Sequence, residues 1–109
     1  MESLKRGDVV WVNLDPTIGA EIRKRRPCVI GSLGVLNARR LTVVVVPLSG
    51  SSTPRPPPVV AVPSAGVDSN ARIDQIRAID KSRVAAAIGK LSTADMEAVA
   101  QALRTVLGL

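Results

Sequence analysis

The stretch Leu41–Leu48 (LTVVVVPL) is the most apolar part of the chain, and it decides the class of fold. Its four consecutive valines indicate a strand, because β-branched side chains favour an extended backbone. A strand with one solvated face would alternate apolar and polar residues, and this stretch does not alternate. We therefore predict a strand at the centre of a sheet, buried on both faces.

Shorter strand signals surround this stretch. We expect strands at Asp8–Leu14, Pro27–Leu33, Pro58–Pro63 and Ala85–Leu91, with one or two more within Ala71–Ile79. Between them, the sequence predicts turns at Asp15–Gly19 and Asn37–Arg40, a loop at Ser49–Pro58 and a single helical turn at Asp80–Val84.

The C-terminal part predicts a helix over Thr93–Leu107, ending at Gly108. Ser92 can cap its start, and Asp95 three residues later approximates a capping box. One face of this helix carries apolar residues, namely Met96, Val99, Leu103, Val106 and Leu107. The expected fold class is therefore α+β and mainly β: a small twisted sheet or barrel with one C-terminal helix packed on it.

The length of 109 residues favours a single domain over 1–109, and 46% apolar residues suffice for a core. The sequence has no histidine, which excludes a Ser-His-Asp triad, a paired-histidine ribonuclease and a histidine zinc site. Cys28 is the only cysteine, so neither a disulfide framework nor a thiolate metal site can form. We expect no metal and no cofactor.

The 15 basic and 9 acidic residues give a formal net charge of +6. A small chain this basic should associate with an anion, with nucleic acid the first candidate and a membrane surface the second. No apolar segment follows the first charged residues as in a signal peptide, and the longest apolar runs are too short to span a bilayer. The expected location is the cytoplasm, without a membrane.

The densest charge feature is the run Arg23–Arg26 immediately before Pro27. Four adjacent cations repel one another, and an anion between them relieves the repulsion. Arginine suits phosphate because its planar guanidinium donates two parallel hydrogen bonds. The run lies between two predicted strands, and Arg39 and Arg40 in the next connection can border the same surface. The alternative is a solvated charge run without a ligand.

Two other polar residues are candidates for chemistry. Glu21 can orient an arginine or accept a proton from a substrate hydroxyl, and the alternative is a loop salt bridge. Ser49 ends the most apolar strand and can donate to a phosphate or a 2'-OH, although serine is also a common turn residue. Trp11 is interpreted as a core or interface side chain rather than a base-stacking one. Cys28 is interpreted as a buried structural thiol.

If the partner is RNA and the protein cleaves it, the missing histidines favour one route. The substrate's own 2'-OH would attack, and the protein would position the phosphate and stabilise the charge on its oxygens. An arginine and a hydroxyl donor suffice for that. Arginine is a poor general base, since its pKa exceeds ~12, so its role would be electrostatic.

The segment Arg6–Glu21 (RGDVVWVNLDPTIGAE), followed by Arg25-Arg26-Pro27, resembles the opening of the MazF/PemK family of toxin ribonucleases. The family pattern runs Gly-Asp, an apolar strand with an aromatic, a Pro-containing turn, Gly-small-Glu and Arg-Pro. Gln75–Arg83 (QIRAIDKSR) resembles the family's Gln-Ile-(Arg/Lys)-x-Ile segment, and Leu91–Leu107 resembles its C-terminal helix. The resemblance covers nearly the whole chain.

This resemblance implies an SH3-like barrel of the MazF/PemK/CcdB type that works as a homodimer. It implies the toxin of a type II toxin–antitoxin system: a metal-independent, sequence-selective endoribonuclease that cleaves single-stranded RNA (mRNA). Attack by the 2'-OH would leave a 2',3'-cyclic phosphate and a 5'-OH. The implied inhibitor is a cognate antitoxin whose acidic C-terminal tail occupies the RNA groove.

The resemblance also implies roles for residues. Arg26, directly before proline, matches the catalytic arginine, and Ser49 matches a position that is usually threonine. Glu21 matches a glutamate that lies near the active site. The expected RNA-binding residues are Thr17, Arg23, Lys24, Arg25, Arg55 and Gln75.

Two alternatives remain at this point. CcdB-like toxins share the fold and poison gyrase through a tryptophan-containing C-terminal tail, whereas this chain ends Val106-Leu107-Gly108-Leu109. A basic nucleic-acid-binding module without catalysis would also account for the charge.

Overall fold

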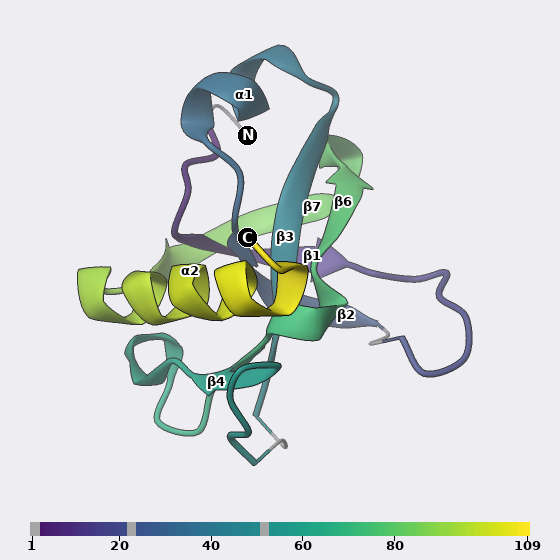
Figure 1. Ribbon diagram of the computed structural model, residues 1–109. Coiled ribbons are helices and arrows are strands. Elements are labelled where there is room, and N and C mark those ends of the chain that lie inside the picture. The colour runs from purple at the N-terminus through teal and green to yellow at the C-terminus, as the bar shows by residue number, and fades with distance from the viewer. Residues whose placement is uncertain (1–2, 22–23, 51–52) are drawn as a thin grey trace.

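The computed structural model of the protein describes residues 3–21, 24–50 and 53–109 (Figure 1). In chain order the elements are β1 (Asp8–Asn13), β2 (Arg25–Ile30), α1 (Gly34–Arg39), β3 (Thr42–Ser49), β4 (Val59–Ala61), the 3-10 turn η1 (Pro63–Ala65), β5 (Asn70–Arg72), η2 (Ile73–Gln75), β6 (Arg77–Asp80), η3 (Lys81–Arg83), β7 (Val84–Lys90) and α2 (Thr93–Leu107). The predicted strands, the helical turn before β7 and the C-terminal helix are all present, with shifts of a few residues at their ends.

Strand β3 lies inside the sheet, as its valines predict. Its neighbours follow the order β4-β5-β3-β2-β1-β7, and all pairs are antiparallel. One edge of β3 pairs with β2. The other edge pairs with β6 as far as Val45 and with β5 from Leu48, so η2 lies where β3 changes partner.

Both faces of the central strands are buried, each in its own core. The first core lies between the sheet and α2, which runs across the front in Figure 1, and includes Val46 and Leu48 of β3 with Val99 of α2. The second core lies on the opposite face and includes Val43 and Val45 of β3. Successive side chains of β3 therefore point in turn into the two cores. Both faces of the strand are apolar for this reason, and its sequence does not alternate between apolar and polar residues.

The connection between β6 and β7 covers the second core. β6 pairs with β3 at one edge of the sheet and β7 pairs with β1 at the other, so η3 must cross over the core between them. Ile79 of β6 is buried in this core and Val84 of β7 packs against it. Among the described residues, hydrogen-bonded pairing does not close the sheet into a complete barrel. The predicted fold class, mainly β with a C-terminal helix, is confirmed.

Helix α2 begins and ends as its sequence predicts, with one difference. The Asp95 N–H donates to Ser92 Oγ (3.1 Å), and Gly108 ends the helix in the left-handed conformation. The Asp95 carboxylate does not return to Ser92, as a capping box would require; it accepts from the backbone N–H of Ser64 (2.8 Å), and the Ser92 N–H donates to Ser64 Oγ (3.0 Å). Leu107, predicted on the apolar face, is 52% exposed.

The polar turn predicted at Asn37–Arg40 is wrong, because α1 ends at Arg39 and includes Asn37. The Asn37 side chain is 2% exposed, and its Nδ2 donates to the backbone oxygens of Leu4 (2.9 Å) and Ser32 (3.0 Å). The partner Leu4 lies 33 positions earlier, so a local reading of the sequence could not show that this asparagine is a core anchor.

No helix in the part of the chain that the structure describes is both long enough and apolar enough to cross a membrane.

We expect Asn37→Ala to lower the free energy of unfolding by about 2 kcal/mol, because it leaves buried carbonyl groups without their donor. Urea denaturation followed by circular dichroism would measure the change. Arg39→Ala, on the exposed side of the same helix, is the matched control and should change stability little. An equal loss in both variants would show that helix content, and not the buried amide, is what matters.

Candidate active site

The register of the sheet brings Arg26 and Ser49 to the same end of neighbouring strands. The last recorded pair between β2 and β3 is Cys28 with Pro47. Arg26 lies two residues before Cys28 and Ser49 two residues after Pro47, so the two face each other when the antiparallel register is continued. On the other side of Arg26, β1 supplies Val12 as its recorded partner.

The two residues also share a face of the sheet. Side chains along a strand alternate, so Arg26 points to the same side as Cys28, which is in the second core. Ser49 points to the same side as Val45, also in the second core. Ser49 is 8% exposed and Arg26 is half-buried. A cation and a hydroxyl thus meet at the rim of the second core, and both make interactions within the protein.

The loop between β1 and β2 projects from the body of the protein (right in Figure 1). It is held by an internal pair of hydrogen bonds: the Ile18 N–H donates to Glu21 Oε1 (2.7 Å), and the Glu21 N–H donates to the Ile18 oxygen (3.3 Å). Thr17 Oγ1 is buried and has no hydrogen-bond partner among the described residues. The Glu21 carboxylate therefore organises its own loop.

The base of this loop has an unusual backbone. Lys24 adopts the left-handed conformation (φ 69°), which side chains other than glycine rarely take, and its oxygen accepts from the Leu14 N–H (2.9 Å). Arg83 Nη1 donates to the oxygens of Asp15 (2.6 Å) and Asn13 (3.4 Å). Sequence reasoning missed this role of Arg83, since about 70 residues separate it from its partners.

The remaining members of the basic run are only partly placed. Arg23 lies outside the described residues. Arg25 is exposed, pairs with Asn13, and borders an open depression of about 370 Å³ together with Trp11. Trp11 is 40% exposed, so its interpretation as a core residue is wrong and the interface interpretation stays a prediction.

Two of the predicted RNA-binding residues come from the other edge of β3. Gln75 ends η2, beside the point where β3 changes partner, and is half-buried. Arg55 is exposed in the loop before β4 and forms an isolated backbone bridge with Val59. Nearby, the sequence analysis overlooked a pair in and after β5, where Arg72 Nε lies 4.0 Å from Asp74 Oδ1.

Arg39 and Arg40 do not border this surface. They precede β3, whereas Ser49 ends it, and the eight-residue strand from Thr42 to Ser49 spans about 23 Å. The short helix α1 carries these arginines to the opposite end of the molecule.

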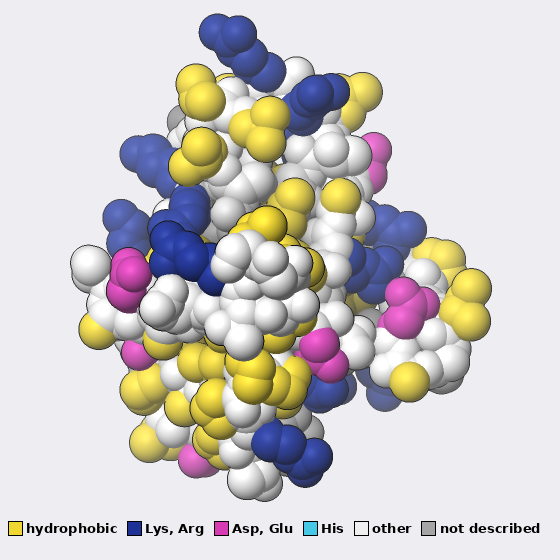
Figure 2. All heavy atoms as spheres, in the orientation of Figure 1, with side chains coloured by type: hydrophobic (Ala, Val, Ile, Leu, Met, Phe, Trp, Pro, Cys, Tyr) yellow, Lys and Arg dark blue, Asp and Glu magenta, His cyan; other side chains and the backbone are white. Residues whose placement is uncertain are grey.

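Figure 2 shows lysine and arginine side chains over much of the visible face, including a group where the projecting loop leaves the body. Among the described residues, no three histidine, cysteine, aspartate or glutamate side chains come together as a metal site would require.

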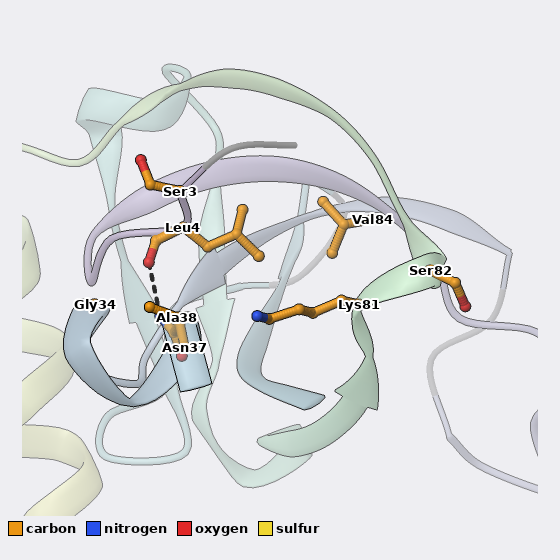
Figure 3. Close-up of a pocket in the computed structure, with 8 residues that line it drawn as sticks. All are labelled: Ser3, Leu4, Gly34, Asn37, Ala38, Lys81, Ser82 and Val84. Atoms are coloured by element: carbon orange, nitrogen blue, oxygen red, sulfur yellow. Dashed lines mark hydrogen bonds between the residues drawn. The ribbon is translucent and has the colours of Figure 1, made fainter. Parts of the chain in front are cut away.

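A separate pocket of about 330 Å³ lies away from Ser49, beside α1 and η3 (Figure 3). Leu4 and Val84 supply apolar walls, the Lys81 amino group reaches toward Asn37 and Ala38, and the Ser82 side chain points away. None of the predicted site residues lines it.

Cys28 lies beneath the arginine–serine pair and is fully buried, as predicted. Burial raises the pKa of its thiol from the ordinary value of 9.0 to about 12, and the positive charge of Arg77 opposes this rise only in part. A thiol with such a pKa is neutral at physiological pH, which excludes it as a nucleophile.

We expect Cys28 to resist a thiol reagent at pH 8 in the folded protein and to react once the protein unfolds. The stability contribution of the raised pKa is fully present below pH 9 and is lost as the pH rises toward 12, because only the unfolded thiol then ionises. Unfolding of the wild type and of Cys28→Ala across this range would measure it. A wild type that loses no more stability than the variant would contradict the assignment.

With the site placed, comparison with known proteins shows where this chain belongs. A family profile described as "PemK-like, MazF-like toxin of type II toxin-antitoxin system" matches residues 5–107. The chain belongs to this family.

Individual relatives and structures agree. Endoribonuclease MazF9 of Mycobacterium tuberculosis is 31% identical over 115 residues, covering 97% of this chain and 98% of that protein. MazF from Deinococcus radiodurans has a similar crystal structure, with a TM-score of 0.88, 26% identity and 98% coverage of both chains. A mycobacterial endoribonuclease in complex with its cognate antitoxin gives a TM-score of 0.81 and 27% identity, covering 96% of this chain and 95% of that one. The predicted family and the predicted enzyme class, an endoribonuclease, are confirmed.

Proposed function

We propose that this protein is the toxin of a type II toxin–antitoxin pair and cleaves single-stranded RNA, mRNA above all, without a metal ion. The observation that carries this proposal is the placement of Arg26 and Ser49 at the same end of the neighbouring strands β2 and β3, in a chain of the MazF-like family. The basic loop beside this rim supplies the charge that RNA requires.

The chemistry follows from the groups at the rim. The 2'-OH of the substrate attacks the adjacent phosphorus, the bond to the 5'-oxygen breaks, and the products carry a 2',3'-cyclic phosphate and a 5'-OH. The guanidinium of Arg26 donates two parallel hydrogen bonds to the phosphate oxygens as negative charge builds on them. The Ser49 hydroxyl adds a neutral donor on the neighbouring strand. The sequence has no histidine for acid–base work, so electrostatic stabilisation is the main contribution of the protein.

The projecting loop between β1 and β2 orients the RNA. In this proposal Thr17, Lys24 and Arg25 bind the strand on one side of the rim, with Arg23 added from outside the described residues. Gln75 and Arg55 bind it on the other side. Sequence selectivity then rests on loop hydrogen bonds, because the chain has one aromatic residue and cannot stack a series of bases.

The proposed partners are a second copy of this chain and an antitoxin with an acidic tail. A homodimer would set two rims side by side for one RNA strand, and an acidic tail would compete for the same cations. Support comes from the mycobacterial relative solved with its cognate antitoxin and from the net charge of +6. The proposed location is the cytoplasm, where mRNA is available.

The decisive test is digestion of a mixed RNA pool in EDTA, with chemical typing of the new ends. We expect cyclic phosphate ends from the wild type, a loss of at least about 100-fold in kcat with Arg26→Ala, and a smaller loss with Ser49→Ala. Ser49→Thr keeps the hydroxyl and should retain cleavage. Binding without cleavage at every sequence would instead support a non-catalytic module, and trapped gyrase complexes would support the gyrase-poisoning alternative.

Glu21 can be tested separately, because two substitutions distinguish a structural role in the loop from a role as proton acceptor. Glu21→Gln keeps an oxygen that accepts from the Ile18 N–H, so we expect it to hold the loop and retain most of the activity. Glu21→Ala removes the acceptor and should lower the cleavage rate by about tenfold through loss of loop order. If Glu21→Gln is as inactive as Glu21→Ala, the carboxylate accepts a proton directly. Initial rates on the RNA identified above would measure both variants.

A further inference from the structure

Arg77 is the first residue of β6 and lies beside the candidate active site, although the sequence analysis assigned it no role. It pairs with Val45, just before β3 changes partner from β6 to β5. Gln75, which is expected to bind RNA, lies two residues earlier. Arg77 therefore occupies the junction between the two strand pairs at this edge of β3.

The side chain of Arg77 is directed to the same face as Arg26 and Ser49. Its recorded partner Val45 and its neighbour Ile79 are both in the second core, and residues with that alternation share one face. The positive charge of Arg77 also acts on the Cys28 thiol. Cys28 is two residues from Arg26 on β2.

Arg77 is half-buried, and its backbone pairs with β3. Within the part of the chain that the structure describes, its guanidinium makes neither a hydrogen bond nor an ion pair. Other arginines of this protein do have acceptors: Arg83 donates to backbone oxygens and Arg104 Nη1 donates to Gln101 Oε1 (2.8 Å). A guanidinium has five N–H donors, and none of those of Arg77 is among the buried unpartnered atoms of the described residues, so they remain accessible to a ligand. An anion from outside the chain would satisfy them.

We propose that Arg77 binds a backbone phosphate of the RNA beside the Arg26–Ser49 pair, as a second cation of the cleavage site. This inference rests on the proposed function. Arg77 then positions the strand on the β6 side of the rim, while Arg26 faces the phosphate that is cleaved. An arginine suits this position because its planar guanidinium can donate parallel hydrogen bonds to two oxygens of the same phosphate.

The test uses the intact protein and a fully 2'-O-methylated single-stranded RNA of mixed sequence, which lacks the nucleophile and cannot be cleaved. Arg77→Met keeps an aliphatic stem over Cys28 and Ile79, so its thermal unfolding should match that of the wild type. We expect it to bind this RNA about tenfold more weakly at 0.1 M salt, as loss of one charged hydrogen-bonded contact predicts. The slope of the logarithm of the binding constant against the logarithm of the salt concentration should become shallower by about 0.7, which is the contribution of one phosphate contact on a single strand.

Two further variants control for charge and geometry. Arg104→Met removes the same charge from α2, which packs on the other face of the sheet, and should leave the salt slope unchanged. Arg77→Lys keeps the positive charge but lacks the planar guanidinium. We therefore expect it to show the salt slope of the wild type and to recover only part of its affinity for this RNA. In cleavage assays Arg77→Met should raise KM about tenfold and change kcat less than about threefold, as expected for a group that binds substrate and transition state alike.

Failure of this inference is distinguishable from failure of the proposed function. If the wild type does not cleave RNA in EDTA, the proposed function is wrong, and the binding series still reports on Arg77. If the wild type cleaves and Arg77→Met matches it in affinity, salt slope and KM, Arg77 binds no phosphate. Normal RNA binding with weakened binding of an oligoglutamate peptide would assign Arg77 to a protein partner and overturn the proposal.

Discussion

Strand β3 buries apolar side chains on both of its faces, and the arrangement of the other elements depends on this. One face requires α2 and the β4–β5 pair as cover, and the opposite face requires the crossing from β6 to β7. At about 25 cal/mol per Å² of buried apolar surface, leaving either face exposed would remove much of the hydrophobic stabilisation of so small a protein. An aliphatic core needs this two-sided burial because the chain has a single aromatic side chain to help fill it.

The same constraint determines where polar chemistry can occur. Within the sheet, polar side chains would be buried without solvent, so Arg26 and Ser49 lie where neighbouring strands leave the core. There the strands still fix the backbone beneath each side chain, with Arg26 half-buried and Ser49 buried at the end of its strand. Rigid strands therefore position the cation and the hydroxyl, and the projecting loop supplies the adaptable contacts. Arg83 connects the two parts by holding the start of the loop against the end of η3.

In the proposed mechanism, arginine takes the place that histidine has in many other nucleases. Because its charge does not titrate near neutral pH, it cannot shuttle protons, and a site built from it stabilises charge instead. The proposal for Arg77 extends this logic: a half-buried cation whose guanidinium has no acceptor among the described residues is available to bind a phosphate. The Cys28 thiol beneath the rim contributes packing but no reactivity, since burial keeps it neutral.

The sequence alone determined most of the fold and the outline of the site. The unbroken valines of β3 and the Ser92 and Gly108 caps of α2 are local patterns, and the structure confirms them because backbone preference and burial agree within a few residues. The basic run before Pro27, Glu21 and Ser49 were candidates from their residue types and positions, and the family resemblance implied their roles without any knowledge of the distances between them. Only the tertiary structure could show that Asn37 is a core anchor, that Arg83 holds the loop and that Arg77 shares a face with Arg26. Each of these depends on partners from distant parts of the chain, and the pairing of strands that are far apart in the sequence decides which side chains share a face.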